Sequence, residues 1–453
     1  MKRGLQGCAI VLMSLGTVSL SQTPAHSPST PHAISYGVAS SVPTTAPEKV
    51  GLSSQRLDRI GEAIQRSVDD GRIAGGLSLV ARHGKVAYLQ AVGMADREAH
   101  KPLRTDNLFR LCSMSKVITA VAVMMLYEDG RFELSDPVSN FLPEFKHMKV
   151  LDPPVPQDHT SPPGALVDAK RPITIMHLLN HTAGLTYPWD NRLGKVYVDA
   201  HVGTGLRQQD STLATSIQRL ATLPLLFQPG DYSEYSLSFD VLGRLVEVVS
   251  GMPYDKFLEE RLFKPLGMKD TYFFLPKDKA ARLAGAYGYN EHQGLYPILD
   301  GKTQAVPTEM GNMFEYTADY PYRGPRTYFS GGAGLNGTIE DYYRFCQMIL
   351  NGGELNGVRI LSPKTVEFMT HNHSPAIPGI LRWGFGVIVH DDPQEMTELG
   401  SLNSFGGGGY YYTSFLIDPH EDLIAIFMSQ LSPDGNLNLN NKVLRLAYQA
   451  IVD

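Results

Sequence analysis

A serine and a lysine three residues apart precede a long apolar run. Residues 109–116 read Phe-Arg-Leu-Cys-Ser-Met-Ser-Lys, and residues 117–126 are apolar except for one threonine. If residues 117–126 form a helix that begins near Ser113, Lys116 shares the face of Ser113. A neighbouring amine can take the serine proton, and the N–H groups at a helix start favour an alkoxide. This S-x-x-K spacing occurs once and predicts a serine nucleophile, although a capping serine and a surface lysine are the simpler interpretation.

A tyrosine follows a turn further along the chain. Residues 229–237 read Pro-Gly-Asp-Tyr-Ser-Glu-Tyr-Ser-Leu and precede a predicted helix with Phe239, Leu242 and Val246 on one face. A nearby lysine would favour the phenolate of Tyr235, which could then act as general base or acid for Ser113. The alternative is a packing tyrosine, because the chain contains 22 tyrosines.

Four consecutive glycines lie close to the C-terminus, where residues 404–410 read Ser-Phe-Gly-Gly-Gly-Gly-Tyr. Glycine allows a backbone to approach a substrate closely and to adopt unusual dihedral angles. A strand edge at this place could supply a backbone N–H to an oxyanion. The alternative is a flexible loop or a bulge.

Composition excludes several classes of protein. The 453 residues carry a formal net charge of -6, so no broad basic surface is available for nucleic acid. Three cysteines cannot form a disulfide scaffold, and the pairing of Cys112 with Cys346 stays open.

The N-terminal residues predict export. Lys2 and Arg3 precede a mainly apolar run over residues 9–20, and small residues follow at a spacing typical of signal peptidase cleavage. We therefore expect a signal peptide over residues 1–21 and a periplasmic or extracellular protein. The run is too short for a stable membrane span, although a buried N-terminal helix is the alternative. Residues 22–48 are rich in proline, serine and threonine and predict a poorly ordered linker.

The remaining pattern predicts an α+β fold. Leu57, Ile60, Ile64 and Val68 recur at helical spacing, and strand-like runs at residues 76–82 and 85–92 form a hairpin signal. A second hairpin signal covers residues 411–417 and 423–428, before a last amphipathic helix. We expect an antiparallel sheet with N- and C-terminal helices, built from residues 49–112 and 325–453. A mostly helical lobe, residues 113–324, is inserted between them.

Together and in this order, the three chemical segments resemble the S-x-x-K, Y-x-N and K-T-G motifs of the serine β-lactamase and penicillin-binding-protein-like superfamily. The resemblance is strongest to family VIII carboxylesterases, which themselves resemble class C β-lactamases. Further segments similar to that family lie at residues 170–175, 177–185, 262–268 and 331–335. The resemblance covers the chain after the linker and implies a β-lactamase/transpeptidase-like fold.

The resemblance also implies roles for individual residues. Ser113 would be the acylated nucleophile, with Lys116 and Tyr235 handling its proton. The backbone N–H groups of Ser113 and Tyr410 would hold the oxyanion, with the third motif on residues 407–409 (Gly407, Gly408 and Gly409). In an alternative register the motif is Phe405-Gly406-Gly407 and Gly408 is the donor.

Departures from the family pattern favour esters as substrates. Leu237 replaces the asparagine of Y-x-N, and glycines replace the lysine and threonine of K-T-G, so the groups that hold an amide or a lactam carboxylate are missing. Tyr187 is expected to line the acyl or alcohol pocket, whereas Trp189 fits core packing. No cofactor and no metal are implied.

The predicted function is that of a serine carboxylesterase for small to medium carboxylic esters. A β-lactamase, a D-amino-acid peptidase or an acyltransferase of the same superfamily is the alternative. A sensor that is acylated but never deacylated is less favoured, because the nucleophile, lysine and tyrosine are all present. The oligomeric state is left open.

Overall fold

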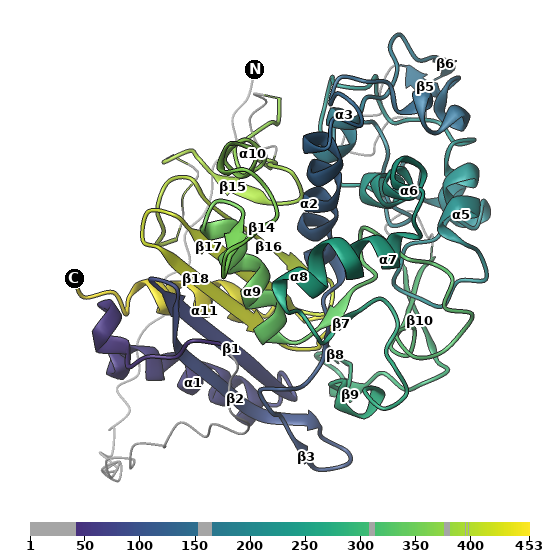
Figure 1. The fold of residues 1–453 in the computed structure, drawn as a ribbon. Coiled ribbons are helices and arrows are strands. Elements are labelled where there is room, and N and C mark those ends of the chain that lie inside the picture. Colours follow the sequence, from purple (N-terminus) through teal and green to yellow (C-terminus); the bar gives the residue numbers. More distant parts are fainter. Residues whose placement is uncertain (1–41, 153–164, 308–312, 376–380, 395, 397) are drawn as a thin grey trace, which may run out of the picture. The chain divides into compact units, whose positions relative to one another are not determined.

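Strands from residues 75–102 and 388–428 form one antiparallel sheet (Figure 1). The computed structural model describes residues 42–152, 165–307, 313–375, 381–394, 396 and 398–453. Its seven-stranded sheet has the order β15-β16-β17-β18-β1-β2-β3, with antiparallel neighbours throughout. The strands are β1 (Gly75–Arg82), β2 (Lys85–Asp96), β3 (Lys101–Pro102), β15 (Ile388–His390), β16 (Ser404–Gly409), β17 (Thr413–Asp418) and β18 (Leu423–Met428). Both predicted hairpins are present, and they join through β1 and β18.

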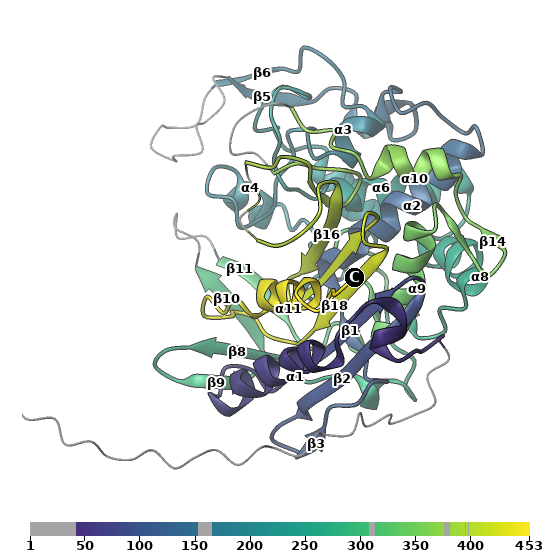
Figure 2. The ribbon, with the colours of Figure 1, turned by 90° about the vertical axis from the view of Figure 1, so that its left-hand side faces the viewer.

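Helices α1 (Ser54–Asp69) and α11 (Leu439–Tyr448) pack side by side on one face of this sheet (Figure 2). Successive side chains of a strand point to opposite faces. Phe427 of β18 accordingly joins the core beneath these two helices, whereas Ile426 and Met428 join the core on the other face. Because both faces are covered, the whole of β18 is buried and its sequence is a continuous apolar run.

The inserted part of the chain is mainly helical. Its central element is α2 (Ser115–Glu128), which packs against α6 (Ser238–Ser250) and is buried from Ser115 to Leu126. The other α-helices of the described chain are α3 (Ile175–Leu179), α4 (Gly194–Asp199), α5 (Leu213–Leu220), α7 (Tyr254–Leu258), α8 (Lys264–Leu266), α9 (Ile339–Leu350) and α10 (Pro363–Met369).

Short strands accompany these helices. They form one three-stranded sheet, β4-β12-β7, and four two-stranded hairpins. Their bounds are β4 (Phe109–Arg110), β5 (Lys149–Asp152), β6 (Ala165–Asp168), β7 (Thr271–Tyr272), β8 (Tyr287–Asn290), β9 (Gly294–Pro297), β10 (Thr303–Pro307), β11 (Met313–Thr317), β12 (Asn336–Gly337), β13 (Glu354–Leu355) and β14 (Val358–Arg359). The α+β architecture predicted from the sequence is confirmed, and these small hairpins are an addition to it.

The predicted signal peptide and most of the predicted linker lie outside the described residues. The last linker residues do pack on the sheet, because Thr45 N–H donates to Val86 O and Val86 N–H donates to Pro43 O. No helix of the described chain has both the length and the apolar character needed to cross a membrane. Cys112 and Cys346 are both buried and unpaired.

Candidate active site

The start of α2 presents Ser113 at the surface of a buried helix. Residues Cys112–Met114 form a 3₁₀ turn that leads directly into α2, and only Ser113 of the three is partly exposed. Cys112 has φ 48°, a left-handed conformation that non-glycine residues rarely adopt. The preceding residue is anchored where Leu111 N–H donates to Leu335 O at 3.0 Å. The surrounding core therefore holds a strained turn that leaves the hydroxyl accessible.

Lys116 lies one turn further along and points back to Ser113. Its Nζ is 3.2 Å from Ser113 Oγ, 2.9 Å from Tyr187 Oη and 2.8 Å from Gly332 O. An ammonium has three N–H donors, so these three oxygens can accept all of them. A neutral amine would instead donate to Tyr187 and Gly332 and could accept the Ser113 proton with its lone pair. The same three contacts accommodate both protonation states.

Tyr235 reaches Ser113 from the loop before α6. Its hydroxyl donates to Ser113 Oγ at 2.6 Å, across 122 residues of sequence. Two backbone hydrogen bonds hold this loop, from Glu234 N–H to His181 O at 2.9 Å and from Leu237 N–H to Thr186 O at 3.3 Å. The structure thus brings Lys116 Nζ and Tyr235 Oη within hydrogen-bonding distance of Ser113 Oγ. The Leu237 side chain itself is buried in the core.

Four aromatic rings form a continuous stack beside these groups. Ring centroids are separated by 4.0 Å from Trp189 to Tyr187, 5.3 Å from Tyr187 to Tyr235 and 5.6 Å from Tyr235 to Trp383. Lys116 Nζ lies 4.5 Å from the centroid of the Tyr235 ring. The stack restricts the orientation of the Tyr235 hydroxyl, because a tilt of its ring would disturb both neighbouring contacts.

Tyr187 lies beneath this site, where it contacts Lys116 and is only 2% exposed. Burial raises the pKa of Tyr187 well above its ordinary value, so its hydroxyl remains neutral. The imidazole of His181 packs against both Tyr235 and Trp383, with ring centroids at 5.0 and 4.7 Å. Burial, followed by the charge of Lys116, lowers the pKa of His181 well below its ordinary value, so this ring adds no charge.

A buried carboxylate on α6 is absent from the sequence-based site. Asp240 is fully buried, and its Oδ1 accepts a hydrogen bond from Gly332 N–H at 3.3 Å. Burial raises the pKa of Asp240 to about 6, against the opposing effects of Ser330, Gly332 and Lys116. The sequence did contain a signal, because Asp240 is the one charged residue in the first turn of the predicted helix, among apolar neighbours.

The glycine run occupies β16, next to the turn that carries Ser113. A Cβ on Gly409 would lie 2.3 Å from Leu111 O, so only glycine permits this close approach. Gly408 is exposed and lies on the strand, whereas Tyr410 lies in the turn between β16 and β17. The Tyr410 ring packs against Phe314 and Tyr316, at 5.8 and 5.2 Å. The preferred register, Gly407–Gly409, therefore lies at the end of β16 that approaches the Ser113 turn, whereas the alternative motif Phe405-Gly406-Gly407 begins at the second residue of the strand.

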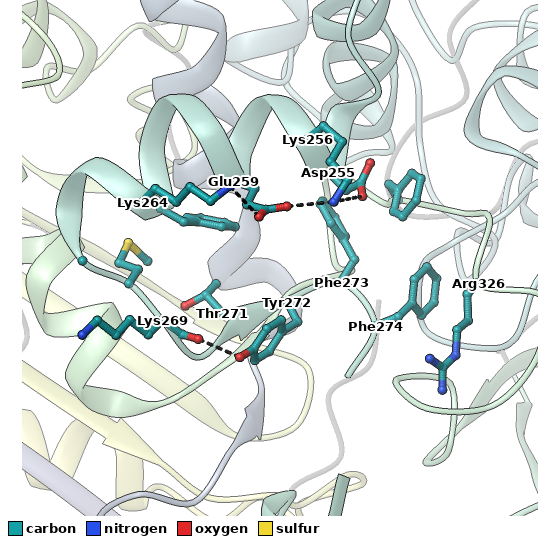
Figure 3. A pocket seen from close by; sticks show the side chains of 14 residues that line it. Asp255, Lys256, Glu259, Lys264, Lys269, Thr271, Tyr272, Phe273, Phe274 and Arg326 are labelled. Atoms are coloured by element: carbon teal, nitrogen blue, oxygen red, sulfur yellow. Dashed lines mark hydrogen bonds and ion pairs between the residues drawn. The ribbon is translucent and has the colours of Figure 1, made fainter. Parts of the chain in front are cut away.

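A separate pocket of about 630 Å³ lies beside α7 and α8 (Figure 3). In it, Glu259 accepts from Lys256 at 2.8 Å and pairs with Lys264 at 2.9 Å, above a group of aromatic rings. Ser113, Lys116 and Tyr235 are not among the residues that line this pocket. One contact between the pocket and the site region is made by Phe273, whose ring is 5.4 Å from that of Tyr254, a neighbour of α2.

Comparison with known proteins gives a consistent result. A family model described as beta-lactamase matches residues 60–449. Esterase EstB of Burkholderia gladioli is 32% identical over 404 residues, covering 88% of this chain and 95% of EstB. An uncharacterized protein of Mycobacterium tuberculosis is 33% identical over 395 residues, covering 83% of this chain and 91% of that protein. The solved structure of EstCE1, described as a hydrolase with promiscuous acyltransferase activity, matches with a TM-score of 0.74 and 30% identity. This match covers 88% of this chain and 99% of EstCE1.

Proposed function

Because the chain belongs to the beta-lactamase family and is a serine hydrolase similar to the family VIII esterases, we propose that it is a carboxylesterase. Its substrates would be small to medium carboxylic esters. Catalysis would proceed through an acyl-enzyme on Ser113. The observation that carries this proposal is the pair of contacts to Ser113 Oγ, from Tyr235 Oη at 2.6 Å and from Lys116 Nζ at 3.2 Å.

In the proposed first step, Ser113 Oγ attacks the ester carbonyl while its proton moves to Lys116. The carbonyl electron pair moves onto the substrate oxygen. The backbone N–H of Ser113 at the helix start and that of Tyr410, or of Gly408 in the alternative register, stabilise this oxyanion. Tyr235 then donates a proton to the departing alcohol and is reprotonated from Lys116. Water repeats the sequence on the acyl-enzyme and restores Ser113.

The preference for esters is supported by two departures from the family's sequence pattern. Leu237 cannot hydrogen-bond a substrate amide, and the glycines of β16 offer no cation to a lactam carboxylate. The esterase name of the relative EstB agrees with this choice.

The test is hydrolysis of a p-nitrophenyl ester series beside the cephalosporin nitrocefin, for the wild type and for Ser113→Ala. We expect ester cleavage that is lost in the variant, with kcat/KM for esters orders of magnitude above that for nitrocefin. Ester turnover that survives in Ser113→Ala would refute Ser113 as the nucleophile. Comparable turnover of both substrates would favour a β-lactamase instead.

A second candidate is acyl transfer to an alcohol other than water, because EstCE1 is described as having that side activity. Addition of a second alcohol to the assay distinguishes the two. In a transferase, the new ester becomes the main product at millimolar alcohol, whereas in a hydrolase the free acid predominates.

We also propose that the protein is exported after cleavage of residues 1–21. The support is the charge and apolar pattern of these residues. N-terminal sequencing of protein recovered from the periplasm or medium tests this. A protein retained in the cell with its N-terminus intact would refute it.

A further inference from the structure

The Gly332 peptide joins two buried ionisable groups, which carry opposite charges once Lys116 is protonated. Its carbonyl accepts from Lys116 Nζ at 2.8 Å, and its N–H donates to Asp240 Oδ1 at 3.3 Å. Lys116 is 2% exposed and Asp240 is fully buried. An isolated charge in a protein interior is costly unless a partner compensates it.

The space beside Gly332 shows how close these groups are. A Cβ on this glycine would lie 3.5 Å from Lys116 Nζ, 3.5 Å from Asp240 Oδ2 and 3.2 Å from Tyr187 Oη. The ammonium and the carboxylate oxygen are therefore no more than about 7 Å apart, since both lie 3.5 Å from one point. Asp240 Oδ2 is buried, and the Ser330 hydroxyl and the backbone N–H groups of Gly332 and Gly331 favour the ionised carboxylate. Glycine at position 332 keeps a side chain from separating the two charges.

The other ionisable groups that face Asp240 do not compensate its charge. They are Tyr254 of α7, Tyr187, and Tyr328 in the segment before β12. Burial raises the pKa of all three tyrosines above its ordinary value, so they are neutral near neutral pH. Among the described residues that face Asp240, Lys116 is the cation.

We propose that Asp240 is a positioning residue that compensates the charge of Lys116 through the Gly332 peptide. This rests on the proposed function, in which Lys116 takes the Ser113 proton. When the Oγ–H bond breaks and a new N–H bond forms, Lys116 becomes an ammonium in a buried site. The Asp240 carboxylate stabilises that ammonium, and its hydrogen bond to Gly332 N–H holds the carbonyl that accepts from Lys116. Asp240 has no contact with the substrate in this role.

The sign of the pH dependence follows from the ionisation of Asp240. With a pKa of about 6, its carboxylate is charged at pH 8 and protonated at pH 5. Protonation removes the compensating charge, so activation of Ser113 should decline as the pH falls through about 6. Asp240→Asn resembles the protonated form, because it keeps an oxygen for Gly332 N–H and lacks the charge.

The test measures the rate at which a fluorophosphonate probe modifies Ser113 between pH 5 and pH 8, which requires nucleophile activation and no ester substrate. We expect Asp240→Asn to react about tenfold more slowly at pH 8 and to lack the decline near pH 6. In ester hydrolysis its kcat should fall while KM stays within about twofold. A merely structural role would not change the pH profile in this way.

Asp341→Asn is the matched control. Asp341 is also buried in the first turn of a helix, and burial raises its pKa to about 6. Its partners are Asp270 N–H and the Thr271 hydroxyl. This variant should keep the wild-type rate and pH profile.

Asp240→Asn with the wild-type rate and the same decline near pH 6 would overturn the inference. If circular dichroism shows that this variant does not fold, the pH profile of the wild type is the test. A wild-type modification rate that does not decline between pH 7 and pH 5 also overturns the inference. A wild type that the probe does not modify at Ser113 would refute the proposed function itself. If the probe modifies Ser113 of the wild type, and Asp240→Asn shows the same pH profile of modification, only this inference is refuted.

Discussion

The core beneath α1 and α11 and the core between α2 and α6 differ in what they bury. The first packs mainly apolar side chains, such as Leu57, Ile60 and Phe427, against the sheet. The second also encloses Lys116 and Asp240, which hydrogen bonds connect through Gly332. Apolar burial stabilises a fold directly, whereas buried charges add little net stability. The comparison indicates that the α1–α11 core supports the fold and that the α2–α6 core serves the proposed chemistry.

The largest effect that we predict is on activity, from Tyr235→Phe. This change removes the hydroxyl that donates to Ser113 Oγ and keeps the stacked ring. We expect kcat/KM for esters to fall about 10²- to 10⁴-fold, with little change in Tm. Steady-state kinetics and thermal unfolding measure the two quantities.

Tyr448→Phe on α11 is the matched control in the other core. Its hydroxyl donates to Asp418 Oδ2 at the same 2.6 Å distance. This variant should lose stability, because a buried carboxylate loses its donor, and should keep its kcat/KM. An activity loss comparable with that of Tyr235→Phe would break the comparison.

The next prediction concerns stability and is somewhat smaller than the effect of Tyr235→Phe on activity. It is for Phe427→Ala in the core beneath α1 and α11. The side chain is fully buried and contacts Gly76 and Tyr412. Its removal should lower the free energy of unfolding by about 3–5 kcal/mol, through lost apolar burial and the cavity left behind. Urea unfolding measures this loss, and kcat/KM of the folded fraction should be unchanged. A folded variant with a shifted pH profile of activity would show that the two cores are coupled.

The smallest predicted effect is the pH dependence of stability due to Asp341, which lies outside both cores. Its pKa of about 6 in the folded protein exceeds the ordinary value of 3.8, so the folded state binds its proton more tightly. Its contribution to stability is therefore fully present below pH 3.8 and is lost as the pH rises through 6. Between pH 7 and pH 4, the wild type should gain up to about 3 kcal/mol of unfolding free energy relative to Asp341→Asn.

The informative quantity is the difference in unfolding free energy between the wild type and Asp341→Asn at each pH. Burial lowers the pKa of His177 to about 4 and that of His390 below its ordinary value. These histidines destabilise the folded state as the pH falls, but they do so equally in both proteins. A stability difference that stays constant with pH would contradict the assignment for Asp341.

Local features of the fold and of the candidate site were predictable from the sequence. Helical spacing of Leu57, Ile60 and Ile64 places α1, and Ser53 caps its start by accepting from Arg56 N–H. The pairing of β1 with β2 follows from two apolar runs on either side of a short turn. The contact between Ser113 and Lys116 was predictable in the same way, because a spacing of three positions at a helix start brings two side chains onto one face.

Tyr235 was predictable from the sequence as a candidate residue, but its position beside Ser113 was not. Its candidacy came from a resemblance to a family pattern, whereas its 2.6 Å contact with Ser113 spans 122 residues. Asp240 was missed because a single acidic residue in a helix usually faces solvent. Tyr187 was expected to line a pocket, but the packing of its segment directs its hydroxyl to Lys116.

The sequence by itself determined the terminal helices, the two antiparallel hairpins of the main sheet and the spacing of Ser113 from Lys116. Only the tertiary structure decided that Tyr235, Asp240 and Gly332 surround that pair. The physical reason is that backbone hydrogen bonds and side-chain periodicity act over a few residues, so the local pattern contains them. Contacts between α2, α6 and the segment before β12 depend on how whole surfaces pack, and residues far apart in the chain contribute to each surface.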